Sequence, residues 1–176
     1  MAKKILVVIP SFVPNKWCFD LLNWLQRSDV SHVVLFDNGG SFPKAKIKDL
    51  RKVEVVNSGC NLNWLASNNL GATIALERGY DYVCFMNDDV FLSGSFFRGM
   101  LRTFEVADNP GIVVPKYDGG FCKAASDKKT KPADWRPQDK EIKVNYTDGT
   151  CMLMPTEVIE KVGFFDPFFR FPNWGA

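Results

Sequence analysis

Short apolar runs alternate with helical patterns through the first two-thirds of the chain, and this alternation limits the possible folds most strongly. Each run is almost continuously apolar, as is typical of strands that are covered on both faces. Strands that alternate with helices form βαβ units around a mostly parallel sheet, so the sequence predicts an α/β fold. The expected strands are Ile5–Ile9, His32–Phe36, Val53–Val56, Tyr82–Met86 and Ile112–Val114.

Three helices are expected between these strands. Trp17–Arg27 and Leu65–Arg78 carry apolar residues at helical spacing, and Gly94–Glu105 ends before an Asn-Pro-Gly turn. The stretch from Phe121 to Lys143 is rich in Lys, Asp and Pro, which indicates a long excursion that is either functional or a solvated insertion. Beyond it we expect strands at Ile142–Tyr146 and Cys151–Met154 and a helix at Pro155–Val162.

Composition narrows the function classes. A length of 176 residues with 46% hydrophobic side chains suits one globular domain. The net charge is only +2, and basic and acidic residues are mixed along most of the sequence, which argues against nucleic-acid binding. The N-terminal apolar run is too short for a signal peptide, and no stretch could cross a membrane, so we expect a cytoplasmic protein. Five scattered cysteines without C-x-x-C spacing are expected to be free thiols.

Polar residues follow the first four expected strands. Ligands of open parallel sheets bind beyond the carboxyl ends of the strands. A single Asp-Asn-Gly-Gly sequence is usually only a turn, because Asn and Gly tolerate positive φ, but four polar strand ends at one edge favour a binding site. These ends are Pro10-Ser11, Asp37-Asn38-Gly39-Gly40, Asn57-Ser58-Gly59 and Asn87-Asp88-Asp89.

The adjacent carboxylates of Asp88 and Asp89 have two interpretations. Two close carboxylates raise each other's pKa unless a cation compensates, and a hard divalent ion with oxygen ligands does so well. Alternatively, they form an acidic turn that caps a helix beginning near Ser93. The residues alone leave both interpretations open.

The segment Asn61–Gly71 is a polar, small-residue entry into the second helix. The amides and partial positive charge of such an entry suit an anionic or hydroxyl-rich ligand. The alternative is simple N-capping by Asn61 or Asn63, with small residues for close packing.

In this order, these motifs resemble the GT-A-fold glycosyltransferases of family 2, especially their rhamnosyltransferase-like branch. The resemblance includes the later Asp148-Gly149-Thr150 and Val162–Phe169 segments and spans nearly the whole chain. It implies a Rossmann-like, mostly parallel mixed sheet flanked by helices in one domain, residues 1–176. Residues 1–115 would bind the nucleotide-sugar and residues 116–176 would form an acceptor-side part.

The resemblance also assigns roles to individual residues. Asp37 would accept from the base, and Asp89 would be the principal ligand of Mn²⁺ or Mg²⁺, with help from Asp88. Independently of the resemblance, the aromatic side chains of Trp135 and Trp174 suit stacking on a sugar ring, with a purely structural role as the open alternative. The implied nucleotide-binding residues are Pro10, Ser11, Asp37, Asn61, Asn68, Asn87 and Asp88, and Asp148 would approach the donor sugar and acceptor.

The activity that the resemblance implies is metal-dependent transfer of a sugar from a UDP- or dTDP-linked donor to a carbohydrate acceptor, with inversion, as in polysaccharide biosynthesis. In this family an acidic pair normally follows the Phe-Phe segment and supplies the general base. Here Arg170–Ala176 follows instead. Either the base lies outside this chain, in further parts of a longer polypeptide, which is the interpretation we favour, or a residue such as Asp148 or Asp166 takes its place.

Two other functions stay open. A sugar-nucleotide nucleotidyltransferase shares the fold type and metal carboxylates, although its glycine-rich opening is missing after the first strand. A non-catalytic nucleotide-sugar-binding module would explain the absent base.

Overall fold

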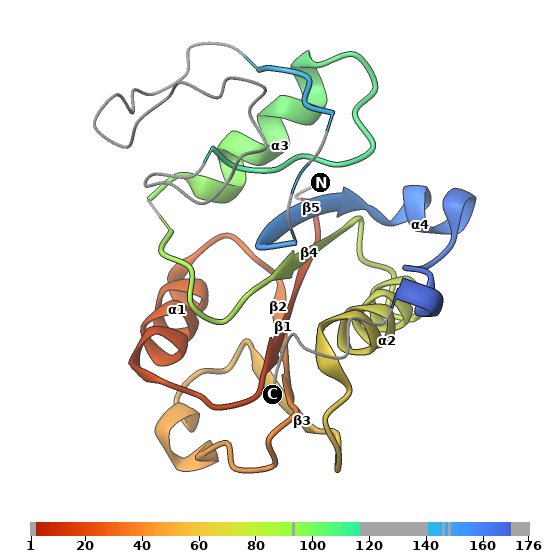
Figure 1. Cartoon of the computed structure of the whole chain (residues 1–176). Helices are drawn as coiled ribbons and strands as arrows, with labels where there is room; N and C mark the ends of the chain where they lie inside the picture. The colour runs from red at the N-terminus through yellow and green to blue at the C-terminus, as the bar shows by residue number, and fades with distance from the viewer. Residues whose placement is uncertain (1–2, 93, 117–140, 146, 148, 170–176) are drawn as a thin grey trace, which may run out of the picture.

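A computed structural model describes residues 3–92, 94–116, 141–145, 147 and 149–169. These residues form one five-stranded sheet in the order β3-β2-β1-β4-β5 (Figure 1). The strands are β1 (Ile5–Ser11), β2 (His32–Asp37), β3 (Val53–Asn57), β4 (Tyr82–Met86) and β5 (Cys151–Pro155). The helices are α1 (Lys16–Arg27), α2 (Asn63–Glu77), α3 (Phe96–Val106) and α4 (Thr156–Val162), with short 3-10 turns η1 (Lys44–Ile47) and η3 (Pro167–Phe169).

The sheet is mixed, as predicted. β1 pairs in parallel with β2 and β4, β2 pairs in parallel with β3, and β5 runs antiparallel to β4. Ser11, Asp37 and Asn57 are register partners across three neighbouring strands, so these carboxyl ends lie at one edge. The α/β class is therefore confirmed.

Two hydrophobic cores cover the two faces of the sheet, and α1 and α2 lie on opposite sides of it (Figure 1). Alternate residues of β1 enter each core: Val7 packs on the α1 side and Val8 on the α2 side. α1 begins where Asn15 accepts hydrogen bonds from two backbone N–H groups of its first turn. Gly71 lets α2 approach closely, because a Cβ there would lie 2.4 Å from a methyl carbon of Val8.

Two expected strands are wrong. Ile112–Val114 does not form a parallel strand, since only Val113 pairs, in an isolated antiparallel bridge to Leu153 of β5. Pro115 follows directly and has no N–H to extend the ladder. Ile142–Tyr146 forms no strand in its described residues 142–145, where Ile142 is 54% exposed, and Tyr146 lies outside the described residues.

The other elements lie close to their predicted bounds. α1, α2 and α3 each begin and end within two residues of the expected positions. α4 begins at Thr156, because Pro155 ends β5 and serves as the N-cap residue. Most of the predicted excursion, residues 121–140, lies outside the described part of the chain. No helix among the described residues is long and apolar enough to cross a membrane.

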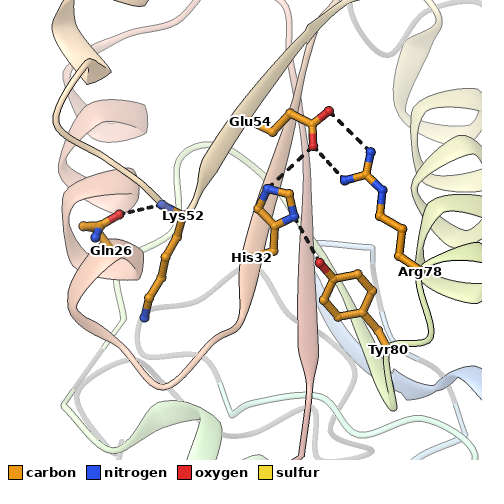
Figure 2. A network of polar contacts seen from close by, with 6 residues as sticks. All are labelled: Gln26, His32, Lys52, Glu54, Arg78 and Tyr80. Carbon is orange, nitrogen blue, oxygen red and sulfur yellow. Dashed lines mark hydrogen bonds and ion pairs between the residues drawn. The ribbon is translucent and has the colours of Figure 1, made fainter.

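A polar network lies at the opposite end of the strands from the candidate site (Figure 2). His32 opens β2, and its Nδ1 lies 3.0 Å from the Tyr80 hydroxyl. Its Nε2 lies 3.6 Å from Glu54, which also accepts a 2.8 Å hydrogen bond from Arg78. Burial lowers the pKa of His32, and the Arg78 hydrogen bond lowers the pKa of Glu54. These contacts indicate a structural role for His32.

Candidate nucleotide-binding edge

Hydrogen bonds join the carboxyl ends of β1, β2 and β4 at one edge of the sheet. The Ser11 hydroxyl, at the end of β1, donates to Asp88 Oδ2 at 2.6 Å, and Ser11 is almost fully buried. The Ser11 carbonyl accepts a 2.9 Å hydrogen bond from the backbone N–H of Asn38, which follows β2. The structure therefore brings together the strand ends that the sequence predicts to meet.

Gly39 explains how two of these ends approach so closely. A Cβ at Gly39 would lie 1.9 Å from the backbone oxygen of Phe12, far inside contact distance. The backbone after β2 therefore lies directly against the backbone after β1. Only glycine fits at this position without separating the two loops.

The segment Asn87–Asp89 presents two different carboxylates. Asp88 is half-buried and Asp89 is exposed. Burial raises the pKa of Asp88, the Ser11 hydrogen bond opposes that rise, and the Asp89 charge adds to it. Since Asp88 is hydrogen-bonded to Ser11, Asp89 is the more accessible carboxylate for a cation.

The helix-capping alternative for this segment is wrong. α3 begins at Phe96, well beyond Asp89, and its N-cap residue is Ser95. The Asp88 carboxylate instead ties the segment after β4 to the end of β1.

Cys18 is fully buried in α1, and its thiol lies near Asp88. Burial and the nearby Asp88 charge raise the pKa of its thiol to about 12. The thiol is therefore protonated near neutral pH and unsuited to act as a nucleophile. Cys18, Cys60, Cys84 and Cys151 are thiols outside any disulfide, as predicted, and Cys122 lies outside the described residues.

Asp37 is buried at the end of β2 and organises the loop that follows. Its carboxylate accepts hydrogen bonds from the backbone N–H groups of Phe42 at 3.0 Å and Ser41 at 3.3 Å. These two bonds use acceptor capacity of both carboxylate oxygens. Recognition of a nucleobase by Asp37 stays a prediction.

Capping is confirmed at the start of α2. Asn63 has a φ of +57°, and its Oδ1 accepts from the N–H groups of Leu65 at 3.0 Å and Ala66 at 3.3 Å. Asn61 Oδ1 accepts from the N–H of Asn63 at 2.8 Å. Side chains of the chain itself therefore use several of the amides that could have faced an anion.

Behind this entry lies a buried network that the sequence analysis did not identify. Asn38 donates to the Ser67 hydroxyl at 3.0 Å and accepts from the Ser58 hydroxyl at 3.2 Å. The network joins the end of β2, the loop after β3 and α2. In the sequence, the network is indicated only by the positions of Asn38 and Ser58, which directly follow β2 and β3.

Asn68, next to this network on α2, is fully buried, and among the described residues neither atom of its amide has a hydrogen-bond partner. Its neighbour Asn69 differs, because its amide forms two hydrogen bonds with the backbone of Phe165. Pro10 is partly buried at the end of β1. Asp148 and Trp174 lie outside the described residues.

The carboxylates at this edge fit a divalent ion that is shared with a ligand. The described residues contain no group of three or more His, Cys, Asp or Glu side chains that could hold a metal by themselves. Mg²⁺ and similar hard ions are often held by one or two carboxylates together with substrate phosphates and water. Asp88 and Asp89 provide such a partial set of oxygen donors.

Comparisons with known sequences give distant relatives. No family model matches the chain. The uncharacterized proteins Rv1525 of Mycobacterium tuberculosis and Mb1552 of Mycobacterium bovis are each 28% identical over 173 residues, which cover 97% of this chain and 63% of theirs. The chain thus spans less than two thirds of the length of the curated relatives it matches.

Solved structures show the fold. The chain aligns with Staphylococcus aureus TarS 1–349 at a TM-score of 0.62 and 14% identity, covering 93% of this chain and 50% of that one. The mannosyltransferase PcManGT from Pyrobaculum calidifontis, in complex with GDP-Man and Mn²⁺, aligns at 0.63 and 12% identity, covering 94% and 48%. A 4-diphosphocytidyl-2C-methyl-D-erythritol synthase aligns at 0.59 and 13% identity, covering 93% and 87%.

Proposed function

We propose that the chain is the donor-binding part of a metal-dependent glycosyltransferase. It would move a sugar from a nucleoside-diphosphate donor, UDP- or dTDP-linked, to a carbohydrate acceptor with inversion. The observation that carries the proposal is the edge where Ser11, Asp37 and the Asp88-Asp89 pair meet. The fold shared with a mannosyltransferase that was solved with GDP-Man and Mn²⁺ supports it.

The charge requirement of the reaction matches this edge. Cleavage of a glycosyl–phosphate bond leaves a nucleoside diphosphate with growing negative charge, which a bound divalent cation would stabilise. Exposed Asp89 would supply the principal protein oxygen for Mn²⁺ or Mg²⁺. Asp88, fixed by Ser11 at 2.6 Å, would keep the segment after β4 in place beside the diphosphate.

Calorimetric titration of the chain with UDP, in the presence of Mn²⁺ and then of EDTA, tests the proposal. We expect binding that requires the metal and that Asp89→Ala abolishes. Asp29→Ala is the matched control. Asp29 is also an exposed aspartate, but it lies in the loop between α1 and β2, near the N-terminal end of β2 and away from the carboxyl edge. UDP binding of equal affinity with Mn²⁺ and with EDTA, or unchanged UDP binding in Asp89→Ala, would contradict the role of Asp89 as a metal ligand.

A nucleotidyltransferase is the second candidate. The aligned 4-diphosphocytidyl-2C-methyl-D-erythritol synthase is covered over 87% of its length, whereas TarS 1–349 and PcManGT are covered over about half. A nucleotidyltransferase releases pyrophosphate from a nucleoside triphosphate, whereas a glycosyltransferase releases a nucleoside diphosphate. Assays for pyrophosphate from CTP or UTP with a sugar phosphate, and for UDP from UDP-sugars, separate the two.

A further inference from the structure

Trp64, in the first turn of α2, is joined by hydrogen bonding to the acidic segment after β4. Its indole Nε1 donates to Asn87 Oδ1 at 3.1 Å. The backbone N–H of Asn87 in turn donates to the carbonyl of Thr150 at 2.9 Å. Asn87, the residue directly before the two aspartates, is therefore held from α2 and from the start of β5.

The indole fixes the orientation of the Asn87 amide. Tryptophan Nε1 is a donor only, so the Asn87 atom that faces it has to be the oxygen. The NH₂ group of Asn87 then points away from the indole. A side chain that could rotate freely after a strand is thus restricted to one of its two amide orientations.

The indole ring is itself held by two other segments. A Cβ at Gly149 would lie 2.8 Å from Cζ2 of Trp64, so the backbone at Gly149 lies against the ring. The Phe165 ring lies 5.3 Å from the indole, centroid to centroid. Asn69 fixes the backbone of Phe165 through hydrogen bonds of 2.8 and 2.9 Å. Trp64 therefore has little freedom to move away from Asn87.

We propose that Trp64 is a positioning residue of the candidate site, which sets the path of Asn87-Asp88-Asp89 through its indole N–H. This inference rests on the proposed function, since it concerns the same metal and diphosphate site. Trp64 is not expected to touch the ligand. Its contribution is to hold Asn87, and with it the carboxylates that follow, in the geometry that the metal and diphosphate need.

Trp64→Phe tests the N–H group specifically, because it retains an aromatic ring and removes the donor. We expect the affinity for UDP in the presence of Mn²⁺ to fall about three- to tenfold, as for the loss of one hydrogen bond. Trp24→Phe is the matched control: Trp24 also packs against a phenylalanine, Phe97, at 6.2 Å, but on α1. We expect that control to bind as the unaltered chain does.

A double-mutant cycle with Asn87→Ala separates positioning from general destabilisation. If Trp64 acts through Asn87, Trp64→Phe has no further effect on affinity in the Asn87→Ala background. An equal loss of affinity in both backgrounds would overturn the proposal, and so would unchanged affinity in Trp64→Phe. If the unaltered chain binds no UDP with Mn²⁺, the proposed function itself fails.

NMR of the unaltered chain tests the same proposal without depending on whether a variant folds. In a ¹⁵N-labelled sample, the indole N–H resonance of Trp64 is expected to shift when UDP and Mg²⁺ are added, whereas that of Trp24 is not. A Trp64 resonance that stays in place while UDP binds would contradict coupling between the indole and the site.

Discussion

Replacing Asn68 by leucine should make the chain more stable and weaken its binding of UDP. Asn68 is fully buried in α2, and neither atom of its amide has a partner among the described residues. A buried polar group without a hydrogen bond costs about 1–3 kcal/mol. Leucine has nearly the same shape without the polar atoms, so most of that cost is removed.

The expected gain in unfolding free energy is therefore about 1–3 kcal/mol, with a few tenths more from the higher helix propensity of leucine. For a chain of this length, each 1 kcal/mol raises the melting temperature by about 2–4 °C. Urea denaturation and differential scanning calorimetry measure the gain. Because Asn68 is one of the predicted nucleotide-binding residues, calorimetry with UDP and Mn²⁺ should show weaker binding in the same variant.

Asn69→Leu is the matched control, one residue along the same helix. Its amide makes two hydrogen bonds to Phe165, so the same substitution should destabilise the chain by about 1–3 kcal/mol. Destabilisation by Asn68→Leu as well would show that the Asn68 amide has a partner in solution, which contradicts the reasoning. A more stable variant with unchanged UDP affinity would remove Asn68 from the binding site.

Two further predictions concern the scaffold. Gly71→Ala should lower the unfolding free energy by about 1–3 kcal/mol, because the added Cβ would lie 2.4 Å from a side-chain carbon of buried Val8. The same change at exposed Gly99 of α3, which has open space around it, should raise the unfolding free energy by about 0.5–1 kcal/mol. Urea denaturation that ranks the two variants in the opposite order would contradict this packing. Acidification should destabilise the chain: burial lowers the folded pKa of His32 from 6.5, so its stabilising contribution, present above that pH, is lost as the pH falls from about 6.5 towards the lowered value. Glu54, whose pKa is also lowered, adds a further loss below about 4.5, and thermal melts between pH 8 and 5 should show a smaller decline in His32→Gln.

The sheet and its polar edge were predictable because local patterns define them. Each run of buried residues ends at polar residues, and the parallel arrangement brings those ends together without any knowledge of side-chain contacts. Val113 shows the limit of this reasoning. Its apolar run looks like a strand, but Pro115 and the position of β5 leave it one antiparallel bridge.

Contacts between distant segments could not be predicted from one sequence. Trp64 and Asn87 are 23 residues apart, and Asn69 and Phe165 are 96 apart. Trp17 shares the helical spacing of the apolar residues in α1, which favours a core position, yet it is 45% exposed and lies against Phe91 of the segment after β4. Such contacts depend on how elements pack, and periodicity indicates only which face of a helix is apolar.

The polar residues at the carboxyl edge are of two kinds: some form hydrogen bonds within the protein that stabilise the edge, and others have polar atoms available to bind a ligand. Asp37 accepts from backbone amides of the loop that follows it, Asn63 accepts from amides in the first turn of α2, and Ser11 donates to Asp88. The Ser11–Asp88 bond joins the ends of β1 and β4, and the other bonds fix the backbone beside the edge, so substitutions at these residues would disturb the edge whether or not a ligand binds. Exposed Asp89 and unpartnered Asn68 carry no such duty in the described part of the chain. Changes at Asp89 therefore separate binding from folding most cleanly, whereas Asn68→Leu is expected to raise stability and lower affinity together.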